Sequence, residues 1–177
     1  MTNPLKEQQP LRQLPLHNKA AFIGIGSELR GDDAVGVVIV KRLAELAKTD
    51  ACSRCLFING GSAPENVLGE IRNFQPEIIV FIDAAILGEA PGTVKLIDTR
   101  REKISGVSFC THSLPLTIIA NYIRQAVPCE IFVIGIEPVD MDFRPDCVLS
   151  PPVAQAAAEV VDSIAAYAGL LENPLSR

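Results

Sequence analysis

The sequence contains no tryptophan, and aromatic residues make up only 5% of its 177 residues. Flat side-chain surfaces on which bases or sugars stack are therefore scarce. Positive charge is also in short supply, because 16 Lys and Arg residues stand against 21 Asp and Glu residues and leave a net charge of −5. Non-specific binding of nucleic acid needs a basic footprint. We therefore expect no nucleic-acid partner.

Long apolar segments are missing as well. No uninterrupted apolar run approaches the length of about 18 residues that crosses a membrane, so we expect no transmembrane helix and no membrane partner. The N-terminal residues are polar and interrupted by Pro4, Pro10 and Pro15, unlike a secretory signal. The cysteines are odd in number and scattered, which argues against a disulfide framework; they are Cys52, Cys55, Cys110, Cys129 and Cys147. These features predict a cytoplasmic protein with reduced thiols.

What the chain does contain is typical of one ordinary globular domain. Apolar residues make up 48% of it and charged residues 21%, and a chain of this length buries about 70% of its extended surface on folding. Residues 1–18 lack periodicity, so we expect a flexible N-terminal arm followed by a single α/β domain over residues 19–177. In that domain short apolar runs alternate with helical patterns, as in α/β layer proteins.

The apolar patterns predict the order of the elements. Strands are expected at 20–26, 56–59, 78–84, 92–97 and 130–135, and helices at 33–48, 64–74, 113–126 and 152–171. The run at 78–84 is the most apolar and is expected at the centre of the sheet. Strands of this kind need cover on both faces. The predicted fold class is therefore α/β: a single-domain three-layer α/β/α sandwich with a mostly parallel central sheet.

The same patterns predict helix ends and buried faces. Ser62 is expected to cap the helix at 64–74, with Pro64 just inside it. The helix at 113–126 is expected to carry its apolar residues on one side: Ile118, Ile119, Tyr122 and Ile123. The inner face of the closing helix is expected to consist of Val153, Ala157, Val160, Ile164 and Leu171.

Polar residues that can carry chemistry fall where strands end. In open α/β sheets the functional site lies at the carboxyl ends of the strands. Asp32 and Asp33 follow the first predicted strand, Asp83 ends the third, and His112 precedes a predicted helix. Asp32 or Asp33 could simply cap a helix, and a lone histidine is more often a capping or core residue than a ligand. Asp83 is harder to explain structurally, because it ends an apolar run where an ionised carboxylate is expensive unless paired or metal-bound.

Together these residues suggest a metal site. Two carboxylates and one imidazole form a plausible three-ligand set for zinc or nickel, and three protein ligands leave positions open for a substrate group. Other motifs are weaker. The Gly24-Ile25-Gly26 segment lacks the third small residue of a dinucleotide fingerprint. The Cys52–Cys55 pair has no partner pair, and we interpret it as two solvent-side thiols before a strand.

Six sequence blocks, in register, resemble the nickel–iron hydrogenase maturation endopeptidases. The blocks are GIGSELRGDDAVG at 24–36, NGGSAPEN at 59–66, FIDA at 81–84, PG at 91–92, THSLP at 111–115 and GIEP at 135–138. The resemblance covers about residues 20 to 170, and the NGGSAPEN block is most similar to the branch that serves hydrogenase 3 of the formate-hydrogenlyase type.

The resemblance implies a cytoplasmic endopeptidase that removes a C-terminal extension from the precursor of a [NiFe] hydrogenase large subunit. In that family the fold is a single α/β/α sandwich, and the nickel arrives with the substrate. The family's metal-contacting positions fall here on Asp33, Asp83 and His112, which are also the expected catalytic residues. In the isolated protein the site is expected to be empty or to hold an adventitious divalent ion such as zinc or cadmium, and docking to a large partner suits a monomer.

Three positions depart from the family pattern. Many members have Asn where this chain has Ser27, and Asp where it has Asn59, and Ala34 replaces a frequent Gly, which matters less. A neutral Asn59 cannot act as a carboxylate base or ligand. No Ser or Cys nucleophile with an adjacent base is evident, so we expect direct attack by water. Two alternatives to the endopeptidase remain: a non-enzymatic nickel-binding or docking module for the precursor, and a self-sufficient zinc hydrolase of small amides.

Overall fold

The computed structural model describes residues 18–49, 52–100, 108–109 and 116–170. Its strands are β1 (Ala20–Ile25), β2 (Cys55–Gly61), β3 (Ile78–Ile86), β4 (Val94–Asp98), β5 (Ser108–Phe109) and β6 (Glu130–Ile136). Its helices are α1 (Val35–Thr49), α2 (Leu68–Phe74), α3 (Leu116–Ala126) and α4 (Pro151–Ala168), with short 3₁₀ turns η3 (Gly31–Ala34) and η4 (Pro64–Val67).

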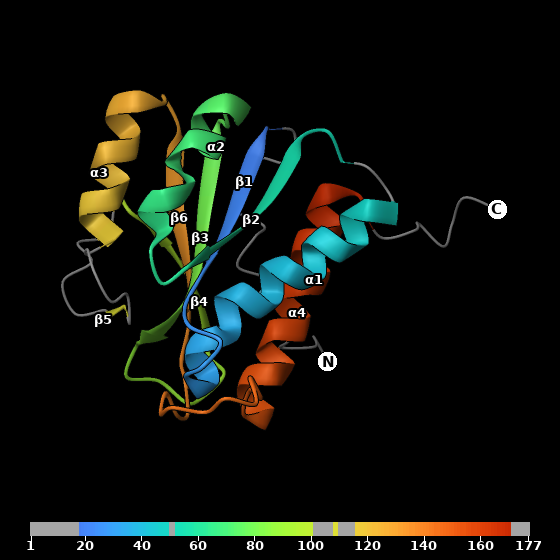
Figure 1. Cartoon of the computed structure of the whole chain (residues 1–177), viewed down its shortest axis with the longest axis vertical. Helices are drawn as coiled ribbons and strands as arrows, with labels where there is room; N and C mark the ends of the chain where they lie inside the picture. The colour runs from blue at the N-terminus through green and yellow to red at the C-terminus, as the bar shows by residue number, and fades with distance from the viewer. Residues whose placement is uncertain (1–17, 50–51, 101–107, 110–115, 171–177) are drawn as a thin grey trace, which may run out of the picture.

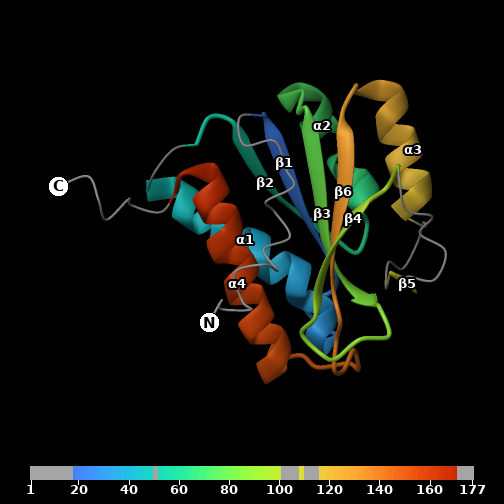
Figure 2. The same ribbon diagram turned by 180° about the vertical axis from the view of Figure 1, so that it is seen from behind.

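The sheet has the order β2-β1-β3-β6-β4, and β3 lies at its centre as predicted. Strands β2, β1, β3 and β6 run parallel, whereas the edge strand β4 is antiparallel to β6. The short strand β5 pairs antiparallel with the end of β3. Helices cover both faces of this sheet (Figures 1 and 2). The predicted α/β/α sandwich with a mostly parallel sheet is therefore confirmed.

The two faces of the sheet bury separate apolar cores. In β1, Ala20 and Phe22 pack into the core beneath α1 and α4, while Ala21, Ile23 and Ile25 pack into the core beneath α2 and α3. Successive residues of a strand point to opposite faces, so a strand covered on both sides has no polar positions. This explains why the strand sequences are continuous apolar runs rather than alternating ones.

Helix α1 lies very close to the sheet because glycines face one another at the contact. A Cβ added to Gly36 would stand 2.0 Å from the Ile82 carbonyl oxygen and 2.6 Å from that of Ile25. A Cβ on Gly24 would stand 2.1 Å from the Gly36 oxygen. The absence of side chains here lets the start of α1 approach the carboxyl ends of β1 and β3.

Several finer predictions are wrong. The helix after Pro64 starts as η4 with Ala63 rather than Ser62 at its N-cap, and no side chain caps it. On α3, Ile119 and Ile123 are buried as predicted, but Ile118 and Tyr122 are about half exposed. Strand β5 was not expected from the sequence.

Other predictions hold or fall outside the described ranges. On α4, the buried residues include Val153, Ala157, Val160 and Ile164, whereas Leu171 is outside the described residues. Most of the predicted arm, residues 1–17, is also outside them. Its last residue, Asn18, donates from Nδ2 to Glu77 Oε2 at 2.7 Å. Among the residues that the structure describes, no helix is both long and apolar enough to cross a membrane.

Candidate active site at the carboxyl edge of the sheet

Three neighbouring parallel strands end at one edge of the sheet, and an acidic residue lies at or just after the end of each. Asp32 and Asp33 follow β1 in the turn η3, Asp83 lies near the end of β3, and Glu137 follows β6. All four side chains are buried. In Figure 1 this edge is at the bottom, where the loops after β1, β3 and β6 converge. The site is therefore built from segments more than 100 residues apart in sequence.

Asp83 is the most deeply buried of these four acids. Its side chain is 0% exposed, and neither carboxylate oxygen has a hydrogen-bond partner of good geometry among the described residues. Burial raises the pKa of Asp83 well above its usual range, and the negative charge of Asp33 raises it further, while the backbone N–H of Ala84 partly opposes both effects. A buried acid without a hydrogen-bond partner of good geometry costs stability, so the position of Asp83 calls for an explanation beyond packing.

Asp33 reaches the same place from β1. The chain turns back sharply after the strand, with Gly26 at φ +126°, where a Cβ would stand 1.7 Å from the Asp33 carbonyl oxygen. The Asp33 Oδ2 accepts a hydrogen bond from the Ser27 backbone N–H at 2.8 Å. Its charge acts on Asp83. The structure therefore brings together two of the three predicted site residues.

Asp32 has a different task from its neighbour. Its Oδ2 accepts hydrogen bonds from the backbone N–H groups of Val139 and Asp140 and from the Ser150 hydroxyl, at 2.9, 3.1 and 2.8 Å. Its Oδ1 accepts one from the Ser150 backbone N–H at 2.7 Å. The N-cap of η3 is Arg30, with no side-chain cap, so the helix-cap interpretation of Asp32 is wrong. The carboxylate ties η3 to the loop between β6 and α4.

Glu137 holds the loop that follows β3. Its Oε2 accepts hydrogen bonds from the backbone N–H groups of Leu87 and Glu89, at 2.6 and 3.1 Å. Sequence reasoning did not single out this residue as part of the site. The available signal was the same as for Asp83, an acidic residue directly after an apolar strand. The carboxylates of Asp32 and Glu137 thus accept hydrogen bonds from neighbouring loops, whereas that of Asp83 does not.

His112, the third predicted ligand, lies outside the described residues. Within the described ranges, no group of three or more His, Cys, Asp or Glu side chains is arranged to hold a metal ion. Of the predicted set, the structure therefore gives the positions of Asp33 and Asp83 but not of His112. The carboxylate oxygens of Asp33 and Asp83 can coordinate a divalent cation.

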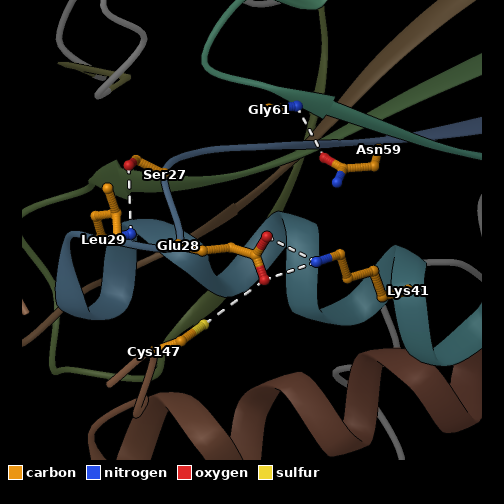
Figure 3. A network of polar contacts seen from close by, with 7 residues as sticks. All are labelled: Ser27, Glu28, Leu29, Lys41, Asn59, Gly61 and Cys147. Atoms are coloured by element: carbon orange, nitrogen blue, oxygen red, sulfur yellow. Dashed lines mark hydrogen bonds and ion pairs between the residues drawn. The ribbon is translucent and has the colours of Figure 1, made fainter. Parts of the chain in front are cut away.

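Ser27 and Asn59, two of the residues that depart from the family pattern, both make hydrogen bonds within the fold (Figure 3). The Asn59 Oδ1 accepts a hydrogen bond from the Gly61 backbone N–H at 3.0 Å, closing a tight turn in which Gly61 has φ +55°. The Ser27 hydroxyl accepts a weak bond from the Leu29 N–H at 3.4 Å. The amide oxygen of Asn59 is enough to accept the hydrogen bond that closes this turn. The presence of Asn59 is therefore explained by the turn, without any role in acid–base chemistry.

The Cys52–Cys55 pair is not a pair of solvent-side thiols, as the sequence interpretation had it. Cys55 is buried at the start of β2 in the core beneath α1 and α4. Burial raises the pKa of the Cys55 thiol to about 12, and the adjacent Cys52 contributes to the rise. A thiol of this kind is inert at neutral pH. Cys52, Cys55, Cys129 and Cys147 are all free thiols.

Comparison with known proteins decides the family. The family model described as HycI, hydrogenase maturation protease, matches residues 37–167. The chain belongs to the hydrogenase maturation protease family. It is therefore an enzyme, a peptide-bond hydrolase, and the predicted resemblance to this family is confirmed.

Individual members of the hydrogenase maturation protease family match most of the chain. The crystal structure of the [NiFe] hydrogenase maturation protease HycI from Thermococcus kodakarensis KOD1 is 34% identical and superposes with a TM-score of 0.74, covering 89% of this chain and 95% of that one. The hydrogenase 3 maturation protease of Escherichia coli K12 is 27% identical over 82% of this chain and 88% of its own length. A crystal structure of a hydrogenase 3 maturation protease is 25% identical, with a TM-score of 0.65, over 84% and 90% of the two chains.

Proposed function

We propose that this maturation protease removes the C-terminal extension from the nickel-loaded precursor of a [NiFe] hydrogenase large subunit. The observation that carries the proposal is Asp83: a fully buried carboxylate beside Asp33, at the edge of the sheet, without a hydrogen-bond partner among the described residues. Relatives named as hydrogenase 3 and [NiFe] hydrogenase maturation proteases support the substrate class. Within this substrate class, we propose that the precursor belongs to a hydrogenase of the hydrogenase 3 type.

The nickel ion belongs to the precursor in this proposal. Asp33 and Asp83 would contact open positions on the ion, and the enzyme would thereby test whether the metal has been inserted. A cation beside Asp83 favours the ionised form of its carboxyl, so binding of the loaded precursor would oppose the upward shift that burial and Asp33 impose on its pKa. This removes the cost of the buried acid only when the metal is present. Metal-free precursor offers no such gain.

We place His112 third in this set. Phe109 pairs with Ala85, two residues beyond Asp83, and His112 follows Phe109 by three residues. Three residues of extended chain reach about 10 Å. Helix α3, which begins four residues after His112, covers the sheet face that contains Ile79 and Phe81. Asp83 has the same strand parity as those two residues, so this is the face toward which its side chain is expected to point.

The cleavage chemistry is hydrolysis. A water molecule attacks the scissile carbonyl carbon, its proton passes to a carboxylate, and the C–N bond breaks as the leaving nitrogen takes up a proton. Asp33 and Asp83 are the described groups that could accept and return the proton. We propose that the enzyme acts as a monomer in the cytoplasm, and that in isolation its site is empty or holds an adventitious zinc or cadmium ion.

The proposal is tested with purified enzyme and two forms of the large-subunit precursor, nickel-loaded and metal-free, whose masses are measured after incubation. A loss of mass confined to the loaded form is expected. Complex formation without mass loss would show a docking module instead of a peptidase. Hydrolysis of small amides in the absence of any precursor would show a self-sufficient hydrolase. Either outcome would overturn the proposal.

A further inference from the structure

Large apolar side chains are exposed on one side of the candidate active site. Leu29, in the loop after β1, is 52% exposed, and Phe143, in the loop between β6 and α4, is 71% exposed. Val139 and Val148 of that same loop are also more than half exposed. We call these four residues the apolar rim. Single exposed apolar residues are ordinary, but these four lie on two loops that hydrogen bonds join beside the candidate active site.

The two loops of the apolar rim are joined by the backbone. The Arg144 N–H donates to the Leu29 carbonyl at 2.7 Å, and the Arg30 Nε–H donates to the Met141 carbonyl at 3.2 Å. These bonds place Phe143, the neighbour of Arg144, next to the segment that leads into η3. The rim is therefore continuous with the turn that carries Asp33.

Asp32 anchors this arrangement from inside. Its carboxylate receives all four hydrogen bonds from Val139, Asp140 and Ser150. Its own backbone N–H donates to the Asp140 carbonyl at 2.8 Å, and a Cβ on the preceding Gly31 would stand only 2.7 Å from that oxygen. A buried carboxylate bound by four donors fixes the start and the end of the loop that presents Phe143.

We propose that Asp32 is a positioning residue for substrate docking: it fixes the apolar rim, on which an apolar segment of the large-subunit precursor lies during cleavage. The inference rests on the proposed function. A polypeptide whose scissile bond lies at Asp33 and Asp83 has to extend over the loops that border them, and the rim borders Asp33 directly. Asp32 acts through the loop and does not touch the reacting atoms, unlike its neighbour Asp33.

The test is a double-substitution cycle in the cleavage of nickel-loaded precursor by the full-length enzyme. Asp32→Asn is expected to raise KM about tenfold, equivalent to about 1.4 kcal/mol of docking energy, and to change kcat by less than about threefold. Phe143→Ala is expected to raise KM about fivefold by itself, but to add little in the Asp32→Asn background, because the loosened loop no longer presents the ring. Ile118→Ala on α3 removes an equally apolar, half-exposed side chain elsewhere and is expected to leave KM unchanged.

An unchanged KM in either Asp32→Asn or Phe143→Ala, or strictly additive effects of the two, would overturn the inference. If Asp32→Asn does not fold, as judged by circular dichroism, the cycle is run with Ser150→Ala, which removes only the hydroxyl donor and is expected to couple to Phe143→Ala in the same direction; additivity there overturns the inference. Failure of the wild-type enzyme to cut the loaded precursor would instead overturn the proposed function.

Discussion

The charge of Asp33 raises the pKa of Asp83 in a site where burial already does so. The two carboxylates come from different strands, and the close approach of α1 to the sheet at Gly36 brings their segments together. Two acids held next to each other repel when both are ionised, and this repulsion opposes folding. Such an arrangement is typical of a site that binds a cation or transfers a proton.

This relationship predicts that Asp83→Asn stabilises the metal-free protein. A carboxyl whose pKa is raised in the folded state keeps its proton there while the unfolded chain loses it, so stability falls as the pH rises above the unfolded value of about 3.9. Each unit by which folding raises the pKa costs about 1.4 kcal/mol once the pH exceeds the folded value, or roughly 3–6 °C in Tm for a chain of this size.

The measurement is the difference in Tm between Asp83→Asn and wild type, taken with a chelator present from pH 4 to pH 8. We expect the difference to be small at pH 4 and to grow in favour of the variant as the pH rises. Asp162→Asn, at an exposed position of α4, serves as a control for removal of one negative charge. A variant less stable than wild type throughout would contradict the uncompensated burial of Asp83.

The close contact between α1 and the sheet predicts a severe effect of a single methyl group. Gly36→Ala places a Cβ against the backbone of Ile82 and Ile25 and is expected to cost about 3 kcal/mol, or roughly 6–12 °C in Tm. Gly69→Ala is the matched control, because Gly69 lies in α2 with nothing within 4 Å of an added Cβ. It is expected to gain up to about 1 kcal/mol. Equal effects of the two substitutions would show that α1 does not depend on this contact.

The hydrogen bonds of Glu137 predict that its substitution by alanine costs more stability than its substitution by glutamine. Glu137→Ala leaves the N–H groups of Leu87 and Glu89 without their acceptor and is expected to cost about 1–2 kcal/mol in urea unfolding, because the loop is partly open to water. Glu137→Gln keeps an acceptor oxygen and is expected to cost less than about half of that. If the glutamine variant is as unstable as the alanine variant, the charge of Glu137 matters more than its hydrogen bonds.

Much of the fold could be predicted from the sequence because burial on both faces leaves a strong local signature. The run at 78–84 is apolar except for Asp83, since β3 is covered by both helical layers. On α3 the prediction failed because Ile118 and Tyr122 repeat with the same spacing as Ile119 and Ile123, and only the packed sheet decides which stripe is buried. Strand β5 has two residues, too few to carry a pattern.

The site was predictable in part for the same reason. Asp83 could be identified because an acid in an apolar run has no cheap structural explanation. Asp32 and Asp33 could not be told apart, since the partners that occupy Asp32 lie 107 to 118 positions away in the chain. Glu137 also follows an apolar strand, but its role could not be predicted because its partners are the backbone groups of a distant loop.

The most direct test of the account is cleavage of nickel-loaded precursor by Asp83→Asn, with His112→Ala alongside and the product followed by a gel shift. Both variants are expected to fold, and both are expected to leave the precursor at full length under conditions in which the wild-type enzyme processes it completely. Full processing by both variants would contradict the assignment of the active site to the carboxyl edge of β3.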